Sequence, residues 1–169
     1  MFGFSKKQRA PSGPIPFDFD VLIDKPTCEV YPLVDWADHR NAKRQLGHVV
    51  EGQSPDFVLH IASMPDHRFT LGITEEEKDK SYAFSCDIQP RVGRLKANHE
   101  RYSFEAVSES QCLLRLVNEV TFIDGMTMAE FEQELMIMSV ATNDALMKLK
   151  VLAELGIDAA KAVENATFG

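Results

Sequence analysis

Three residues in the central part of the chain have side chains that could bind a metal ion: His60, His67 and Cys86. They lie on or beside strands that we expect to be neighbours, and neighbouring strands are about 5 Å apart. Against a metal site, the chain has no C-x-x-C, H-x-x-x-H or H-E-x-x-H spacing, and His60 lies on the strand face opposite Phe57 and Leu59. We therefore expect no metal cofactor.

Sequence motifs for catalysis and nucleotide binding are absent. Cys86 lies in line with Phe84 and Ile88 on one strand face, as a small core residue would, whereas a reactive thiol needs a base and an electropositive pocket. The nine glycines form neither G-x-G-x-x-G nor G-x-x-x-x-G-K-[ST], and no G-x-S-x-G marks a nucleophilic serine. Paired carboxylates stay open, because acid–base geometry is spatial. We expect no cofactor, and a non-catalytic role is favoured over an enzyme.

A short basic stretch could form an anion patch. Its members are Arg91, Arg94, Lys96 and Arg101. Nucleic-acid surfaces add interleaved aromatic residues, which this stretch lacks, so a solvated basic face is the simpler interpretation. The whole chain has 26 acidic and 18 basic side chains and a formal charge of -8, which repels phosphate backbones and anionic lipids. We expect neither a nucleic-acid nor a membrane partner.

Methionines gather on or beside one long predicted helix over 128–155. Five of the seven are there: Met126, Met128, Met136, Met138 and Met147. Residues 135–140 are apolar nearly all round, whereas a helix that packs on one side only has a single apolar stripe. Flexible thioethers suit a surface that accepts different partners, although methionine is also a common core filler. We expect a partner-binding surface that includes Met128, Met136, Met138 and Met147, covered by a second copy or another protein.

The strands that position these residues follow from period-2 alternation. It predicts strands over 17–24, 57–64, 68–73, 82–88, 102–106 and 112–123. Turns at Pro65-Asp66 and over 108–111, with a charged connector over 75–80, arrange five of them as a three-stranded meander and a hairpin. Residues 28–34 form a weaker extended segment, because Pro32 interrupts it.

Capping signals predict the helices. Asp35 can cap a helix over 36–49, and the stretch 91–101 is predicted as a short helix. Thr127 and Glu130 form a capping box between Met126 and Phe131, which predicts a helix from 128 to 155 that ends at Gly156. A short tail helix follows over 159–166.

These elements predict one α+β domain over 17–169, an antiparallel sheet packed by the long C-terminal helix. A chain of 169 residues is long enough for one core. Residues 1–16, basic and rich in proline, are predicted to be a flexible basic arm. No apolar run reaches the roughly 20 residues of a bilayer crossing, no secretory signal is recognised, and three widely spaced cysteines indicate reduced thiols in a cytoplasmic protein.

The element order over 35–155 resembles the αβββαββα arrangement of type III secretion chaperones and the related bacterial YbjN-type sensory-transduction-regulator proteins. The strand and turn VTFIDG (120–125), followed by the capped helix start TMAEF (127–131), are similar in style to the end of those domains. The resemblance implies a non-catalytic, chaperone- or adaptor-like dimer that binds a protein partner, and it carries over no functional residue. The alternative is a small-molecule-binding α+β domain with a pocket between sheet and long helix, lined by residues such as Phe84 and Met136.

Overall fold

The structure, a computed structural model, describes residues 9–167. Its elements, in chain order, are β1 (Ile15–Ile23), α1 (Thr27–Val34), α2 (Ala42–Gln45), β2 (Val49–Gln53), β3 (Asp56–His60), β4 (Arg68–Glu77), β5 (Ser81–Gln89), β6 (Leu95–Ser108), β7 (Gln111–Phe122), α3 (Met128–Leu155) and α4 (Ile157–Thr167). None of these helices is long and apolar enough to cross a bilayer.

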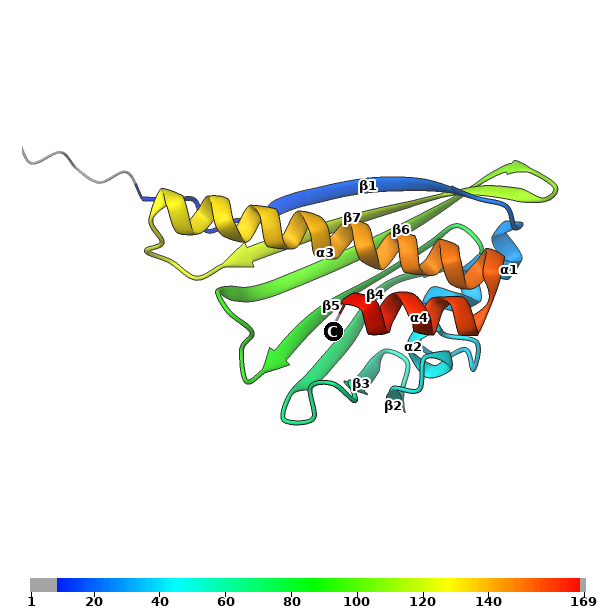
Figure 1. Cartoon of the computed structure of the whole chain (residues 1–169), viewed down its shortest axis with the longest axis horizontal. Coiled ribbons are helices and arrows are strands. Elements are labelled where there is room, and N and C mark those ends of the chain that lie inside the picture. Colours follow the sequence, from blue (N-terminus) through cyan, green and yellow to red (C-terminus); the bar gives the residue numbers. More distant parts are fainter. Residues whose placement is uncertain (1–8, 168–169) are drawn as a thin grey trace, which may run out of the picture.

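The strands form one antiparallel sheet of seven, in the order β1-β7-β6-β5-β4-β3-β2. Helix α3 runs along one face of this sheet, and α4 folds back beside it (Figure 1). Helices α1 and α2 lie near the end of the sheet where α3 ends. The predicted α+β fold, an antiparallel sheet packed by a long C-terminal helix, is confirmed.

The predicted meander and hairpin are present, with different strand ends: β4 continues through Glu77 into the connector predicted over 75–80, and the strand predicted over 57–64 ends at His60. Phe57 pairs with Leu71 and Leu59 with Phe69 between β3 and β4, and all four side chains are buried. β5 continues the meander, β6 and β7 form the hairpin, and β1 adds to the far side of β7. The alternation located these strands because one face of each packs against the helices.

The capping box that opens α3 is formed as predicted. The Thr127 hydroxyl accepts a hydrogen bond of 3.2 Å from the Glu130 amide, and the Glu130 carboxylate accepts one of 2.9 Å from the Thr127 amide. Met126 and Phe131 are both buried in one apolar cluster, as a hydrophobic staple requires. Gly156 has a φ of 86° and ends the helix, which fixes both ends of α3 where the sequence predicted them.

Two predictions before β2 are wrong. Residues 28–34 are not extended but form α1, in which every side chain from 30 to 34 is buried, so tertiary packing outweighs the unfavourable Pro32. The helix predicted over 36–49 is absent, and only the single turn α2 lies there before β2 begins. Asp35 ends α1 instead of capping a helix, and its side chain accepts a hydrogen bond of 2.8 Å from the Ala37 amide in a local turn.

Two further predictions are wrong in the described part of the chain. The short helix expected over 91–101 is absent, because Leu95 and the residues that follow it belong to the long strand β6. Residues 9–16 are not a free arm: the Ala10 amide donates to the Met126 carbonyl, and the Phe122 amide donates to the Ser12 carbonyl. The remainder of the predicted arm, residues 1–8, lies outside the described residues.

The core consists of two apolar clusters on the helix side of the sheet. The larger one joins α1, the inner face of β3–β7 and the C-terminal half of α3, with Trp36 and Leu146 among its members. The smaller one surrounds the start of α3 and includes Phe122 and Phe131, whose rings meet edge to face at 6.1 Å. The cavity described below lies against the larger cluster, whose members Leu33, Phe84 and Leu149 line it.

Candidate ligand-binding site

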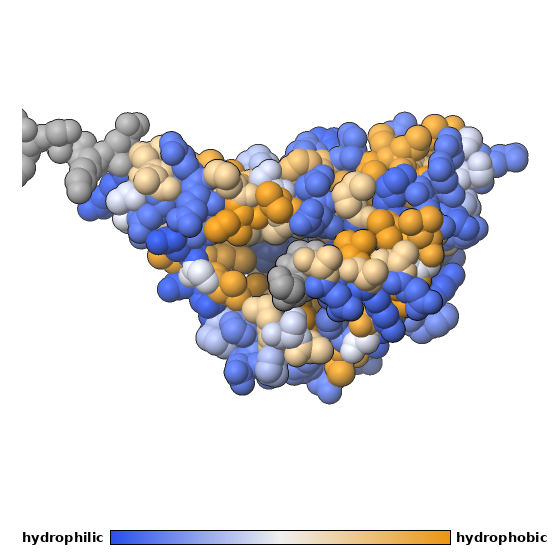
Figure 2. Space-filling model, in the orientation of Figure 1, coloured by the Kyte–Doolittle hydropathy of each residue, from blue (hydrophilic) through white to orange (hydrophobic). Residues whose placement is uncertain are grey.

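A cavity of about 400 Å³ lies between the sheet and α3. Small-molecule sites commonly have volumes of about 300–1,000 Å³. Figure 2 shows the face of the molecule hollowed below α3, with apolar side chains around the hollow. The apolar residues that line the cavity include Leu33, Trp36, Leu46, Leu59, Ile61, Phe69, Leu71, Phe84, Ile88, Ala145, Leu149 and Leu152.

Aromatic side chains form one wall of the cavity. Trp36 meets Phe84 edge to face at 5.4 Å, and Phe84 stacks on Tyr102 at 6.3 Å with an interplanar angle of 22°. The Trp36 amide donates a hydrogen bond of 3.2 Å to the Tyr82 hydroxyl, which fixes the start of the loop after α1 against the sheet. The wall is therefore held in place by the sheet rather than by loops alone.

Glu100 brings a carboxylate into this apolar cavity from the centre of β6. Residues 98, 100 and 102 share one face of that strand, since side chains alternate across a sheet. Tyr102 donates a hydrogen bond of 2.9 Å to Glu100 Oε2, and Asn98 Nδ2 donates one of 3.3 Å to Oε1. Burial raises the pKa of Glu100, while the Tyr102 bond and the positive charge of Lys43 act in the opposite direction.

Lys43 brings an ammonium group to the same cavity from α2. Asn41 positions this helix: its side-chain amide donates to the carbonyls of Val34 at 3.2 Å and Asp35 at 3.1 Å, and its Oδ1 accepts from the Lys43 amide at 3.0 Å. Burial lowers the pKa of Lys43, and the nearby charges of Glu164 and Glu100 partly offset this effect.

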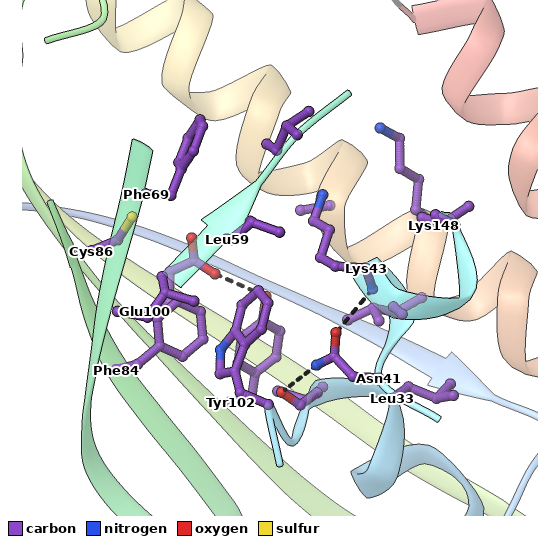
Figure 3. Close-up of a pocket in the computed structure, with 18 of the residues that line it drawn as sticks. Leu33, Asn41, Lys43, Leu59, Phe69, Phe84, Cys86, Glu100, Tyr102 and Lys148 are labelled. Carbon is purple, nitrogen blue, oxygen red and sulfur yellow. Dashed lines mark hydrogen bonds between the residues drawn. The ribbon is translucent and has the colours of Figure 1, made fainter. Parts of the chain in front are cut away.

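The two charged groups lie on different sides of the cavity. In Figure 3 the Glu100 carboxylate points inward beside Cys86 and Phe84, whereas Lys43 and Lys148 extend from the helices on the other side. Among residues 9–167 no ion pair joins Lys43 to Glu100. The cavity thus offers an acceptor at one side and a donor at the other, separated by apolar and aromatic surface.

The three cysteines form no disulfide, and the thiol in the cavity is not activated. Cys28 is exposed, Cys112 is buried, and Cys86 lines the cavity. Burial raises the pKa of the Cys86 thiol to about 12 and that of Cys112 to about 11. A thiol with so high a pKa is almost entirely protonated at neutral pH, so Cys86 acts here as an apolar lining residue.

The structure groups no metal ligands within residues 9–167: no cluster of three or more His, Cys, Asp or Glu side chains is arranged to hold an ion. His60 Nε2 lies 3.5 Å from a carboxylate oxygen of Glu51 on the neighbouring strand, and His67 lies in the turn before β4. The candidate trio His60, His67 and Cys86 is therefore not brought together.

Carboxylates neutralise half of the predicted anion patch. Arg94 forms ion pairs of 3.0 Å with both Glu130 and Glu134 at the start of α3. Arg101 forms a two-pronged pair with Glu75, with both N···O distances 2.9 Å. Within residues 9–167, Arg91 and Lys96 are exposed and form no ion pair, so the four side chains do not form one open cationic site.

The methionines of α3 divide between surface and core. Met136 is 72% exposed, and its neighbours Ile137 and Val140 are 51% and 60% exposed. Met128 and Met147 are also exposed, whereas Met138 packs partly buried against the smaller apolar cluster. The expected lining of the pocket is half correct, because Phe84 lines the cavity and Met136 points away from it.

Sequence reasoning missed the polar residues of the cavity, among them Lys43, Asn98 and Glu100. The signal was present: Asn98 and Glu100 are spaced by two from Tyr102 and Phe104, so all four side chains share the inward face once the segment is recognised as a strand. The error over 91–101 hid this signal, because a helix would have spread these side chains around its axis.

Comparison with known proteins gives a fold and no family. No family profile and no curated protein sequence matches the chain. Among solved structures, the Aha1 dimer from Colwellia psychrerythraea is 11% identical, with 84% of this chain and 98% of that chain covered and a TM-score of 0.59. A protein from Rhizobium leguminosarum is 10% identical, with 94% and 99% covered and a TM-score of 0.58. The Mll3558 protein from Rhizobium loti is 15% identical, with 78% and 96% covered and a TM-score of 0.53.

At these identities the likeness shows the fold alone. The resemblance to type III secretion chaperones and YbjN-type proteins stays a prediction. The element order behind it also differs from the observed one, because β6 occupies the stretch in which a helix was expected.

Proposed function

We propose that this chain binds a small, largely apolar molecule in the cavity between the sheet and α3. The observation that carries the proposal is the cavity itself, about 400 Å³ in volume and lined by aromatic and aliphatic side chains from α1, the sheet and α3. Larger side chains could have filled a space of this size, and apolar walls that stay in contact with water forgo the stabilisation that burial gives. A bound apolar ligand would bury these walls.

Trp36 provides a direct test, because it is the single tryptophan of the chain and lines the cavity. We expect 1-anilinonaphthalene-8-sulfonate to bind with one saturable site and to accept excitation energy from Trp36. The variant Ala145→Phe places a ring into the cavity from α3 and should weaken binding at least tenfold, since the site would be filled.

The matched control is Ala129→Phe, an exposed alanine in the first turn of the same helix, which should bind the dye as the unchanged protein does. Circular dichroism melts confirm that both variants are folded. Non-saturable binding, or equal binding by the two variants, would show that the cavity is not a ligand site.

A second function, self-association or protein binding through the outer face of α3, is favoured by one specific observation. Met136, Ile137 and Val140 are exposed apolar residues that lie within one helical turn of each other on that helix. Soluble monomers seldom keep large apolar patches in water. The Aha1 structure is described as a dimer, which is a property of that protein. Sedimentation equilibrium at micromolar concentration tests the proposal here: twice the 19.0 kDa chain mass supports a homodimer.

A further inference from the structure

The cavity holds two opposite charges that do not neutralise each other. Lys43 and Glu100 both line it, yet no ion pair joins them in the described chain. Both residues are half-buried, and loss of hydration is the largest influence on the pKa of each. Charges withdrawn from water in this way cost stability unless partners compensate them. If the cavity bound only hydrocarbons, apolar residues at positions 43 and 100 would make the protein more stable.

The Glu100 side of the cavity presents hydrogen-bond acceptors. The Tyr102 hydroxyl and the Asn98 amide each donate to one carboxylate oxygen of Glu100, and an ionised carboxylate has about four acceptor positions. About two positions therefore remain for a ligand. Because Tyr102 directs its own proton to Glu100, its oxygen too can only accept. A ligand group that lies here has to be a donor, such as a hydroxyl.

The Lys43 side presents hydrogen-bond donors. Its ammonium group has three N–H donors, and no described side chain accepts a hydrogen bond from it. The charges that face it come from several elements: Glu164 on α4, Lys148 on α3 and Glu100 on β6. Asp144 also lines the cavity from α3. None of the three carboxylates lies within ion-pair distance of Lys43, so an acceptor oxygen of a ligand would be its nearest partner.

We propose that Glu100 and Lys43 are the specificity-determining residues of this cavity, so that its ligand carries a donor group at one end and an acceptor oxygen at the other. This inference rests on the proposed function, the binding of a small molecule. The rings of Phe84 and Tyr102 lie beside Glu100 (Figure 3), and Trp36, which meets Phe84 edge to face, also lines the cavity. These rings favour a flat, aromatic body for the ligand. The ligand class is thus a hydroxylated aromatic carbonyl or carboxylate compound.

Four related probes separate the contributions of the two ends: naphthalene, 2-naphthol, 2-naphthoic acid and 6-hydroxy-2-naphthoic acid. Their affinities are measured by isothermal titration calorimetry on the full chain. A hydrogen bond to a charged partner contributes roughly tenfold or more in affinity, so we expect 6-hydroxy-2-naphthoic acid to bind at least tenfold more tightly than naphthalene.

Two variants assign each end to its residue. Glu100→Gln should reduce the affinity gained from the hydroxyl group and leave the gain from the carboxylate group unchanged. Lys43→Met should reduce the affinity gained from the carboxylate group and leave the gain from the hydroxyl group unchanged. Glu105→Gln, an exposed position on the same strand, and Lys78→Met, in the exposed β4–β5 turn, are the matched controls and should bind all four probes as the unchanged protein does.

Each outcome separates this inference from the proposed function. If none of the four probes binds, the small-molecule function fails and the inference fails with it. If all four bind with similar affinity, the function survives, and the assignment of Glu100 and Lys43 is wrong. Variants that weaken all four probes equally would also contradict the assignment, because a damaged cavity rather than a lost polar contact would explain them. Thermal melts by circular dichroism show which variants are folded.

Discussion

The hydroxyl of Tyr102 donates a hydrogen bond of 2.9 Å to Oε2 of Glu100, two residues earlier on the same strand, inside a cavity with mostly apolar walls. Alternation along β6 places both side chains on the face that α3 covers. The bond from Tyr102 stabilises the ionised form of Glu100, so its removal should have a measurable effect on the pKa of this carboxyl group.

The variant Tyr102→Phe should raise the pKa of Glu100 further. Burial raises this pKa from its ordinary value of 4.5, and the hydrogen bond from Tyr102 opposes that rise by stabilising the carboxylate. Without the hydroxyl, the effect of burial on the pKa is offset less. The measurement is a ¹³C NMR titration of the Glu100 carboxyl carbon in both proteins. An unchanged or lower pKa in the variant would contradict the hydrogen bond.

The variant Glu100→Gln should stabilise the ligand-free protein at neutral pH. The folded-state pKa of Glu100 lies above its unfolded-state value near 4.5. The stability linked to this group is therefore complete below pH 4.5 and is lost as the pH rises through the folded-state pKa, because the carboxyl group then ionises while buried. We therefore expect the unfolding free energy of the variant, relative to that of the unchanged protein, to be about 1 kcal/mol higher at pH 7.5 than at pH 4. Urea denaturation at both pH values checks this.

The same experiment on Lys43→Met has the opposite pH dependence. Burial lowers the folded-state pKa of Lys43 below its ordinary 10.5, so stability linked to this group is present above that value and is lost as the pH falls through the folded-state pKa. Glu164, Lys148 and Glu100 face this group. The variant should thus gain relative stability as the pH falls from 10.5, and a constant difference across this range would refute the argument.

The capping box contributes measurably to the stability of α3. Thr127→Ala removes the side-chain acceptor for the Glu130 amide, and the loss of an N-cap hydroxyl costs about 1 kcal/mol. Ser139→Ala, in the middle of the same helix, is the control and should be neutral or slightly stabilising, since alanine is the better helix former. Urea denaturation midpoints measure both, and equal effects would count against the cap.

His48 and Glu164 attach α4 to the body of the protein. His48 Nε2 lies 2.7 Å from Glu164 Oε1, with side chains only 7% and 12% exposed. His48→Leu should therefore increase amide hydrogen exchange over 157–167 about tenfold without a similar change in β6. His39→Leu, at an exposed position, serves as control. Hydrogen-exchange mass spectrometry resolves these segments, and uniform protection in all three proteins would disprove the attachment.

The exposed face of α3 should determine any self-association. The double variant Met136→Lys/Val140→Lys adds charge at two exposed apolar positions and should sediment near 19.0 kDa, even where the unchanged protein is a dimer. Gln133→Lys, an exposed polar position on the same helix, should leave the mass unchanged. A dimer that resists the double variant must form through another surface.

Most of the fold could be predicted from local signals. The capping box at Thr127 and the terminating Gly156 located α3, and alternation located β3, β4, β5 and β7, because one face of each strand is buried and the other is not. The exception is instructive. In β6 the inward face begins with Asn98 and Glu100, which line the cavity, so the apolar alternation is lost where the strand contributes polar groups.

The other errors have a similar physical origin. The apolar run of α1 is buried on all sides from Val30 to Val34, and such a run has no period that separates helix from strand. The Asp35 side chain accepts a hydrogen bond from the amide two residues later, in a turn. Aspartate is favoured at a helix N-cap for the same reason, because its carboxylate accepts from a nearby backbone amide, so the residue type alone does not separate the two structures. The cavity itself is lined by segments far apart in sequence, such as those that carry Lys43 and Glu100, and no local pattern encodes it.

The pairing of β1 with β7 also has a consequence for biosynthesis. β1 lies at one edge of the sheet, and its register with β7 joins Ile15 to Val120 and Ile23 to Cys112, a separation of roughly one hundred residues that slows folding. At ribosomal rates of about 5–20 residues per second, β1 waits about 5–20 seconds for its partner. Phe17 and Phe19 stay accessible to other chains during that interval, while the alternate positions Asp18 and Asp20 carry negative charge, which discourages premature pairing of this nascent strand.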